Sequence, residues 1–99
     1  MPPVSCPVPW LCGYTGAAYS GTASAIRGDV NPSLPSTADY VGFHTGRSVF
    51  NNTGECAVVY NRAHYQGQSL TVRPQAGIRN LPASFGHILS IRFAMCQGR

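Results

Sequence analysis

Few side chains in this 99-residue sequence could carry out chemistry. Hydrolysis or group transfer needs a nucleophile beside a base, a pair of carboxylates, or a bound metal ion. The available acids and histidines are Asp29, Asp39, Glu55, His44, His64 and His87. None of the histidines has a second ligand at the spacing typical of metal sites. We therefore predict that the protein is not an enzyme and has no catalytic residue, no metal site and no cofactor.

Cysteines offer a second kind of chemistry, metal ligation or disulfide formation. The four are Cys6, Cys12, Cys56 and Cys96, separated by 6, 44 and 40 positions. Structural zinc sites usually take two closely spaced pairs, which these separations do not provide. An even number of cysteines in a short, weakly charged chain instead predicts two disulfides and an oxidising compartment, so we expect a secreted protein. The count alone allows three pairings.

The charge of the sequence is modest and dispersed. Seven arginines and no lysine stand against three acids, which gives a formal net charge of +4. The arginines form no run and accompany no nucleic-acid-binding motif, so we expect no nucleic-acid partner. No apolar stretch approaches the roughly 20 residues that cross a bilayer, and no leader-like segment precedes Cys6. We therefore expect a mature chain without membrane insertion.

The elements that must position these residues are short strands. Gly, Pro, Ser and Thr interrupt every stretch, and no window carries apolar residues at helical spacing over three turns. Runs of β-forming residues predict strands at 11–15, 22–26, 47–51, 56–61, 69–73 and 88–94. Their regular spacing favours an all-β sandwich. The length suits one domain, spanning residues 1–99.

An internal repeat divides this domain into two motifs, the first over about 10–52 and the second over about 55–97. Tyr14-x4-Tyr19-x-Gly21 recurs 46 positions later as Tyr60-x4-Tyr65-x-Gly67. This spacing predicts a folded hairpin in each half, closed by the second tyrosine, with a glycine that takes positive φ or permits a close approach. Ser48 and Ser90, on the last strand of each half, are placed to bond the backbone of that hairpin.

Two segments depart from the repeat. The first half is longer, because glycine to serine spans 27 positions there and 23 in the second half. We place the insertion at Asn31–Thr37, where two prolines disfavour a regular central strand. Between the halves, Asn51-Asn52-Thr53 matches a glycosylation sequon. We interpret it as a polar turn.

The repeated motif resembles the βγ-crystallin superfamily. Within it, the sequence is similar to small secreted actinobacterial proteins of the streptomycete metalloproteinase inhibitor family, on Cys6-Pro7-x4-Cys12, the segment 56–60, and the turn 51–54 before it. The resemblance implies two Greek-key motifs in a βγ-crystallin-like sandwich stapled by disulfides. It also implies the pairing of Cys6 with Cys12 and of Cys56 with Cys96, and inhibition of a peptidase.

Calcium is the common ligand of that superfamily. Its ligand pattern is a pair of Asn or Asp residues, then any two residues, then Ser or Thr followed by Ser. Aligning this pattern on Ser48 and Ser90 places Phe43, His44, Arg47, Phe85, Gly86 and Leu89 at the other ligand positions. Neither set has a carboxylate, whereas Ca²⁺ takes six to eight oxygens with some negative charge. We therefore expect no high-affinity calcium site.

A rigid scaffold can bind a partner through a protruding loop, and three loops are candidates. The first, Pro7–Leu11, offers Pro9 and Trp10; the second, Asn31–Thr37, offers Leu34 and Pro35; the third is Pro74–Arg79. In an inhibitor such a loop would lie extended across the active site. Trp10 could act as a binding hot spot or could cover the open end of the core.

We expect a monomeric binding protein that acts on an extracellular peptidase as its inhibitor. An alternative is an antimicrobial, antifungal or killer-toxin-like protein that binds cell-wall polysaccharide. That role needs several coplanar aromatic rings, for which the candidates are Tyr19, Tyr65, Tyr40 and Trp10. A second alternative is a structural or interaction protein without inhibitory activity, because the duplication alone explains most of the aromatic residues.

Overall fold

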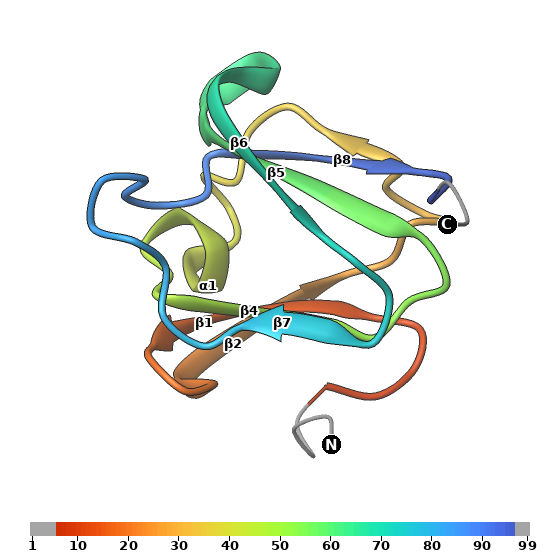
Figure 1. The fold of residues 1–99 in the computed structure, drawn as a ribbon, viewed down its shortest axis with the longest axis horizontal. Helices are drawn as coiled ribbons and strands as arrows, with labels where there is room; N and C mark the ends of the chain where they lie inside the picture. Colours follow the sequence, from red (N-terminus) through yellow and green to blue (C-terminus); the bar gives the residue numbers. More distant parts are fainter. Residues whose placement is uncertain (1–5, 97–99) are drawn as a thin grey trace.

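Two four-stranded antiparallel sheets pack face to face in the computed structural model, which describes residues 6–96 (Figure 1). The first sheet has the order β2 (Ser20–Ile26), β1 (Leu11–Gly16), β4 (Ser48–Asn51) and β7 (Ala76–Ile78). The second has the order β3 (Ser33–Leu34), β8 (Ser90–Ala94), β5 (Cys56–Arg62) and β6 (Gln66–Val72). The helical turns are α1 (Val41–His44) and η1 (Ala63–Tyr65). The predicted all-β sandwich is confirmed.

The two halves exchange one strand each, which gives the Greek-key connection. Strand β3 of the first half pairs with β8 of the second, and β7 of the second half pairs with β4 of the first. Neither exchanged strand was expected from the sequence, because each is only two or three residues long. Both lie at sheet edges, where a neighbouring proline is tolerated.

The exchanged strands also locate the extra length of the first half. Leu34 and Ile78 are equivalent, since each pairs with the residue that follows the motif serine of the other half. In the first half, Leu34 lies 13 positions after the motif glycine and 14 before the motif serine. In the second half, Ile78 lies 11 positions after its glycine and 12 before its serine. The insertion is therefore divided between the two sides of β3 and does not form one loop at Asn31–Thr37.

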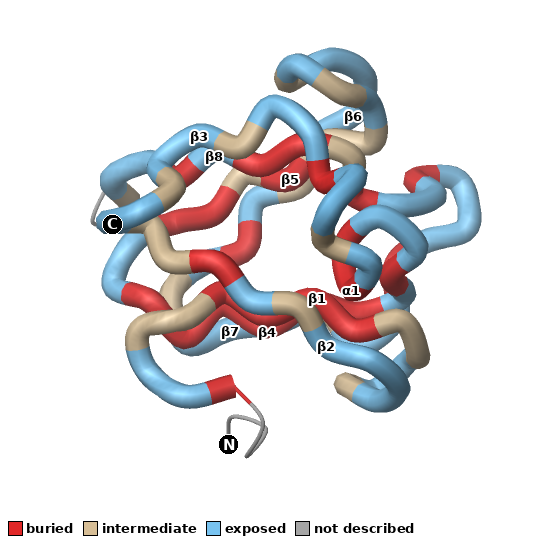
Figure 2. Tube along the Cα trace, turned by 180° about the vertical axis from the view of Figure 1, so that it is seen from behind, coloured by how far each residue is buried: buried red, intermediate tan, exposed pale blue. Residues whose placement is uncertain are grey.

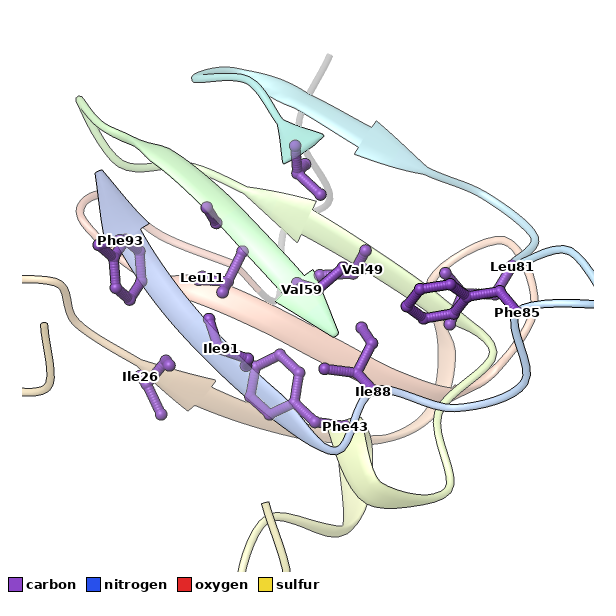
Figure 3. Packing of buried hydrophobic residues seen from close by; sticks show 12 residues of the cluster. Leu11, Ile26, Phe43, Val49, Val59, Leu81, Phe85, Ile88, Ile91 and Phe93 are labelled. Atoms are coloured by element: carbon purple, nitrogen blue, oxygen red, sulfur yellow. The ribbon is translucent and has the colours of Figure 1, made fainter. Parts of the chain in front are cut away.

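The main core fills the space between the sheets. Figure 3 shows Val49 of β4, Val59 of β5 and Ile91 of β8 directed into this space. All three are fully buried, as is Phe43, which α1 directs into the core. These residues alternate along their strands with outward-facing ones, as a half-buried sheet requires. A helix of four residues is too short for a periodic apolar pattern, so α1 could not be predicted from the sequence.

Both folded hairpins have the predicted backbone. Gly21 and Gly67 have φ of 82° and 78°, the region that a glycine enters without a steric penalty. Tyr19 and Tyr65, two positions earlier, also have positive φ, near 61°. Each packs edge-on against the first tyrosine of its motif, with ring centroids 5.6 and 5.8 Å apart. The repeat therefore specifies the same local structure twice.

The four cysteines form two disulfides, Cys6–Cys12 and Cys56–Cys96, as the resemblance implies. The first closes the segment before β1. The second joins the start of β5 to the residues after β8, two strands that are already paired through Cys56 and Ala94.

The segment between the halves is a polar turn, as predicted, and its residues Asn51, Asn52 and Thr53 are also buried. Asn51 is fully buried, and its side-chain amide donates to the carbonyls of Glu55 at 2.7 Å and Val72 at 2.8 Å. A glycan needs an exposed asparagine, so the folded protein cannot use this sequon.

Candidate functional site

The segment Cys6–Cys12 forms a closed loop beneath the first sheet. Its two cysteines are buried, and their Cα atoms lie 5.9 Å apart. Between them, the Trp10 amide donates to the Pro7 carbonyl at 3.0 Å, which closes a tight turn. Val8 lies at the tip of this turn with 69% of its surface exposed. The loop thus runs between buried ends, first exposed at Pro7 and Val8 and then half-buried at Pro9 and Trp10 (Figure 2).

Trp10 lies at the base of this loop and is half-buried. Its ring packs on a second apolar cluster, separate from the main core, that consists of Cys6, Cys12, Tyr14 and Phe50 with Tyr19 at its margin. Trp10 therefore covers the outer face of the first sheet. The expectation that it covers the open end of the core is wrong, because strand alternation turns its partners Cys12, Tyr14 and Phe50 away from the main core.

Arg27 also packs on the Trp10 ring. Its guanidinium lies 5.6 Å from the centre of the Trp10 ring. The same guanidinium forms two hydrogen bonds to the Asp29 carboxylate, at 3.0 and 2.6 Å. These hydrogen bonds lower the pKa of Asp29 and raise the pKa of Arg27. Since Leu11 and Ile26 are paired, the closed loop and the turn after β2 leave the first sheet at the same end.

The second candidate loop does not protrude. Leu34 packs against the main core from β3, and the Pro35 carbonyl accepts a hydrogen bond from the His64 amide at 2.9 Å. The Thr37 amide donates to the Leu89 carbonyl at 3.0 Å. This segment is therefore held along the second sheet, and the structure does not bring Leu34 and Pro35 together with Pro9 and Trp10.

The third candidate loop is also held in place. Within Pro74–Arg79, the Gln75 amide donates to the Asn51 carbonyl, and the Arg79 carbonyl accepts from the Ala18 amide, both at 2.7 Å. Strand β7 occupies the middle of this segment. Among the three candidates, the disulfide-closed loop is the one that exposes a large apolar side chain, Val8.

The four candidate aromatic residues for sugar binding do not all share one face. Trp10 and Tyr19 pack on the same cluster at the outer face of the first sheet, and the other two lie elsewhere. Tyr19 lies on the outer face of the first sheet, nearly perpendicular to Phe50 at 86°. Tyr65 lies in η1, which connects β5 to β6 of the second sheet, and the Arg92 guanidinium lies 4.4 Å from the centre of its ring. Tyr40 packs beside Phe43 of α1. Burial raises the pKa of Tyr19, and the nearby Arg79 guanidinium opposes that rise.

The residues aligned with calcium ligands have other roles. Phe43 and Phe85 are core residues. His44 approaches the Thr37 hydroxyl at 3.4 Å. His87, which lies between the aligned positions of the second half, contacts the Gly46 carbonyl at 2.8 Å. Within residues 6–96, no three His, Cys, Asp or Glu side chains gather to hold a metal ion, and no pocket opens at the surface. No helix in this part of the chain could span a membrane.

Sequence reasoning named Pro9 and Trp10 in the closed loop but missed Val8. Val8 is one of three strongly exposed large apolar residues in the described chain that come from segments leaving the sheets at one end. The other two are Val30 and Met95, with 66% and 84% of their surfaces exposed. A valine between two prolines inside a short cysteine-bounded segment is a signal that could have identified Val8. Prolines on both sides of it disfavour a regular strand, so such a valine is expected in a turn.

Solved structures with the same architecture are βγ-crystallins or related proteins. One, from a study of the evolution of the eye-lens βγ-crystallin domain fold, has a TM-score of 0.76 at 12% identity and covers 93% of this chain and 92% of that chain. A βγ-crystallin domain from Flavobacterium johnsoniae has a TM-score of 0.70 at 14% sequence identity, and the match covers 90% of this chain and 98% of that domain. IPSE/alpha-1 from Schistosoma mansoni eggs has a TM-score of 0.68 at 17% sequence identity, and the match covers 87% of this chain and 84% of that chain. These likenesses establish the βγ-crystallin fold.

The sequence itself matches a described family over most of its length. No curated protein matches it closely enough to count as a relative. The model of peptidase inhibitor family I36, however, matches residues 1–72, which include the closed loop, the whole first motif and the first hairpin of the second. Inhibitors of this kind bind peptidases and have no catalysis of their own. The chain therefore belongs to peptidase inhibitor family I36.

Proposed function

We propose that this protein is a secreted, monomeric inhibitor of an extracellular peptidase and that it contacts the peptidase through the closed loop Cys6–Cys12. The observation that carries the proposal is the family match over residues 1–72, which include this loop. Metallopeptidases are the first target class to examine, because the sequence resembles the streptomycete metalloproteinase inhibitors. Two disulfides support export to an oxidising compartment.

The closed loop supports the proposal by its rigidity. A loop that is already ordered loses little conformational freedom on binding, so more of its contact energy appears as affinity. The disulfide fixes the ends of this loop, and a hydrogen bond from the Trp10 amide to the Pro7 carbonyl fixes its turn. Since this turn is tight, the loop cannot lie extended across an active site, contrary to the expectation from sequence.

The proposed function is tested with the purified, oxidised protein against a metalloendopeptidase and serine endopeptidases, each assayed with a short chromogenic peptide. We expect competitive inhibition of at least one at micromolar concentration or below. A pull-down on chitin and β-glucan is run beside it. We expect no retention, because only two of the four candidate rings, Trp10 and Tyr19, share a face, and a polysaccharide platform needs several. Absence of inhibition at micromolar concentration would contradict the proposal and leave the structural or interaction role.

A further inference from the structure

Val8 is a large apolar side chain at the tip of the closed loop, with 69% of its surface exposed. We infer that Val8 enters the specificity pocket of the target peptidase and that the loop blocks the active site as a turn that the peptidase cannot cleave. This inference rests on the proposed function and adds to it the residue that binds, the kind of pocket and the fate of the loop.

The environment of Val8 presents a preordered apolar side chain. Pro7 and Pro9 fix the backbone φ on either side of it. Valine itself is branched at Cβ and has few rotamers, so binding costs little side-chain entropy. A pocket that accepts it must be apolar and must fit a small branched aliphatic side chain. A pocket built for arginine or lysine would gain no charged partner from this loop.

The base of the loop is fixed to the rest of the protein by Asn52. Its side-chain amide donates to the Cys6 carbonyl at 2.8 Å, and its backbone amide donates to the Trp10 carbonyl at 3.0 Å. Asn52 is itself buried. These two bonds hold both arms of the loop, while Arg27 packs over the Trp10 ring. The turn is therefore supported from both ends and cannot open without losing these contacts.

The same geometry prevents the loop from binding as a substrate does. Peptides that add to an exposed sheet edge do so as extended strands through main-chain hydrogen bonds. A fully extended segment from Cys6 to Cys12 would span about 20 Å, whereas these Cα atoms lie 5.9 Å apart. Pro7 and Pro9 have no N–H to donate, and the Trp10 N–H is already bonded to Pro7. The bond that follows Val8 also joins a proline nitrogen.

The experiment compares wild type, Val8→Ala, Val8→Asp and a matched control, Val41→Asp, which changes another exposed valine, on α1. The peptidases are a thermolysin-type metalloendopeptidase and an elastase-type serine peptidase, whose pockets take apolar side chains, and trypsin, whose pocket takes basic ones. Thermal unfolding of each variant verifies that it folds. The mass of the inhibitor is measured after prolonged incubation, before and after reduction, because cleavage within the loop adds one water and separates the chain only when the disulfide is reduced.

We expect inhibition of one or both apolar-pocket peptidases and none of trypsin, and the two arms distinguish a metallopeptidase target from a serine peptidase target. Val8→Ala should weaken inhibition about tenfold and Val8→Asp at least about 100-fold, with Val41→Asp unchanged and the inhibitor intact. If wild type inhibits but folded Val8→Asp inhibits equally, or trypsin alone is inhibited, the role of Val8 is wrong while the proposed function stands. Cleavage between Cys6 and Cys12 during inhibition would overturn the turn mechanism. Inhibition of none of the three would overturn both proposals.

Discussion

Ser48 and Tyr19, which are 29 positions apart, are joined by a hydrogen bond of 3.0 Å from the Tyr19 amide to the Ser48 hydroxyl oxygen. The same hydroxyl donates to the Gly16 carbonyl at 2.7 Å. Ser90 repeats this arrangement in the second half, accepting from the Tyr65 amide at 2.9 Å and donating to a carbonyl at 2.6 Å. Each hydroxyl thus fixes both arms of a hairpin whose tip has positive φ.

The first prediction concerns these two hydroxyls. Both serines are fully buried, so Ser48→Ala or Ser90→Ala leaves a backbone amide and a carbonyl without their partner. We expect each substitution to lower the free energy of unfolding by about 1–3 kcal/mol. The two effects should nearly add, because the sites lie on different sheets. The measurement is urea unfolding, with Ser84→Ala at an exposed position as the control. Equal stability of the Ser48→Ala variant and this control would contradict the role of the hydroxyl.

The second prediction separates the two disulfides. Cys56–Cys96 joins residues 40 positions apart and Cys6–Cys12 residues 6 apart. A longer closed loop restricts the unfolded chain more. Replacing Cys56 and Cys96 with alanines should therefore lower the free energy of unfolding by about 4 kcal/mol, and replacing Cys6 and Cys12 by about 2 kcal/mol. At temperatures where both variants are folded, the variant without Cys6–Cys12 should lose more inhibition than the variant without Cys56–Cys96, because Cys6–Cys12 closes the proposed contact loop. Chemical unfolding and inhibition assays on the two variants test this, and retention of full inhibition without Cys6–Cys12 would argue against the closed loop as the contact.

The third prediction concerns the Arg27–Asp29 pair. Its hydrogen bonds lower the pKa of Asp29 in the folded protein, so the stability it contributes is present above the ordinary carboxyl pKa of about 3.9 and is lost as pH falls through the folded value. Both side chains are partly exposed, with 35% and 62% of their surfaces accessible, so the effect on stability is small. Carboxyl ¹³C NMR should show Asp29 titrating below its ordinary range, and Arg27→Gln should move it upward. An unchanged titration in the variant would show that Arg27 is not the cause.

The repeat explains why so much of the fold could be predicted. Tyr14-x4-Tyr19-x-Gly21 and its second copy encode the hairpins locally, through residues that need a particular φ or a close backbone approach. The exchanged strands could not be predicted in this way. Ser33–Leu34 forms a strand only because β8 of the other half lies beside it, and tertiary pairing of this kind leaves no period in two residues.

The candidate site was predicted only in part, for a related reason. The cysteine spacing identified the closed loop, but residue type drew attention to Trp10, which packs on Cys12, Tyr14 and Phe50. The exposure of Trp10 depends on which side chains of β1 and β4 lie on the same face of the sheet as its ring. A single sequence does not reveal this arrangement. Prolines predict a loop at Leu34 and Pro35. Backbone hydrogen bonds to the second hairpin and to β8 hold them along the sheet instead.

The fourth prediction is that calcium does not stabilise this protein. The positions aligned with the superfamily's ligands hold Phe43 and Phe85, whose side chains belong to the main core and supply no oxygen. A site with a dissociation constant of 10 μM would add about 2.7 kcal/mol at 1 mM calcium, which corresponds to a rise in Tm of more than about 10 °C for a domain of this size. We expect the Tm in 1 mM calcium and in EDTA to agree within about 1 °C, with magnesium as the control for ionic strength. A calcium-specific rise of several degrees would show that backbone carbonyls near Arg47 or Leu89 form a site without carboxylates.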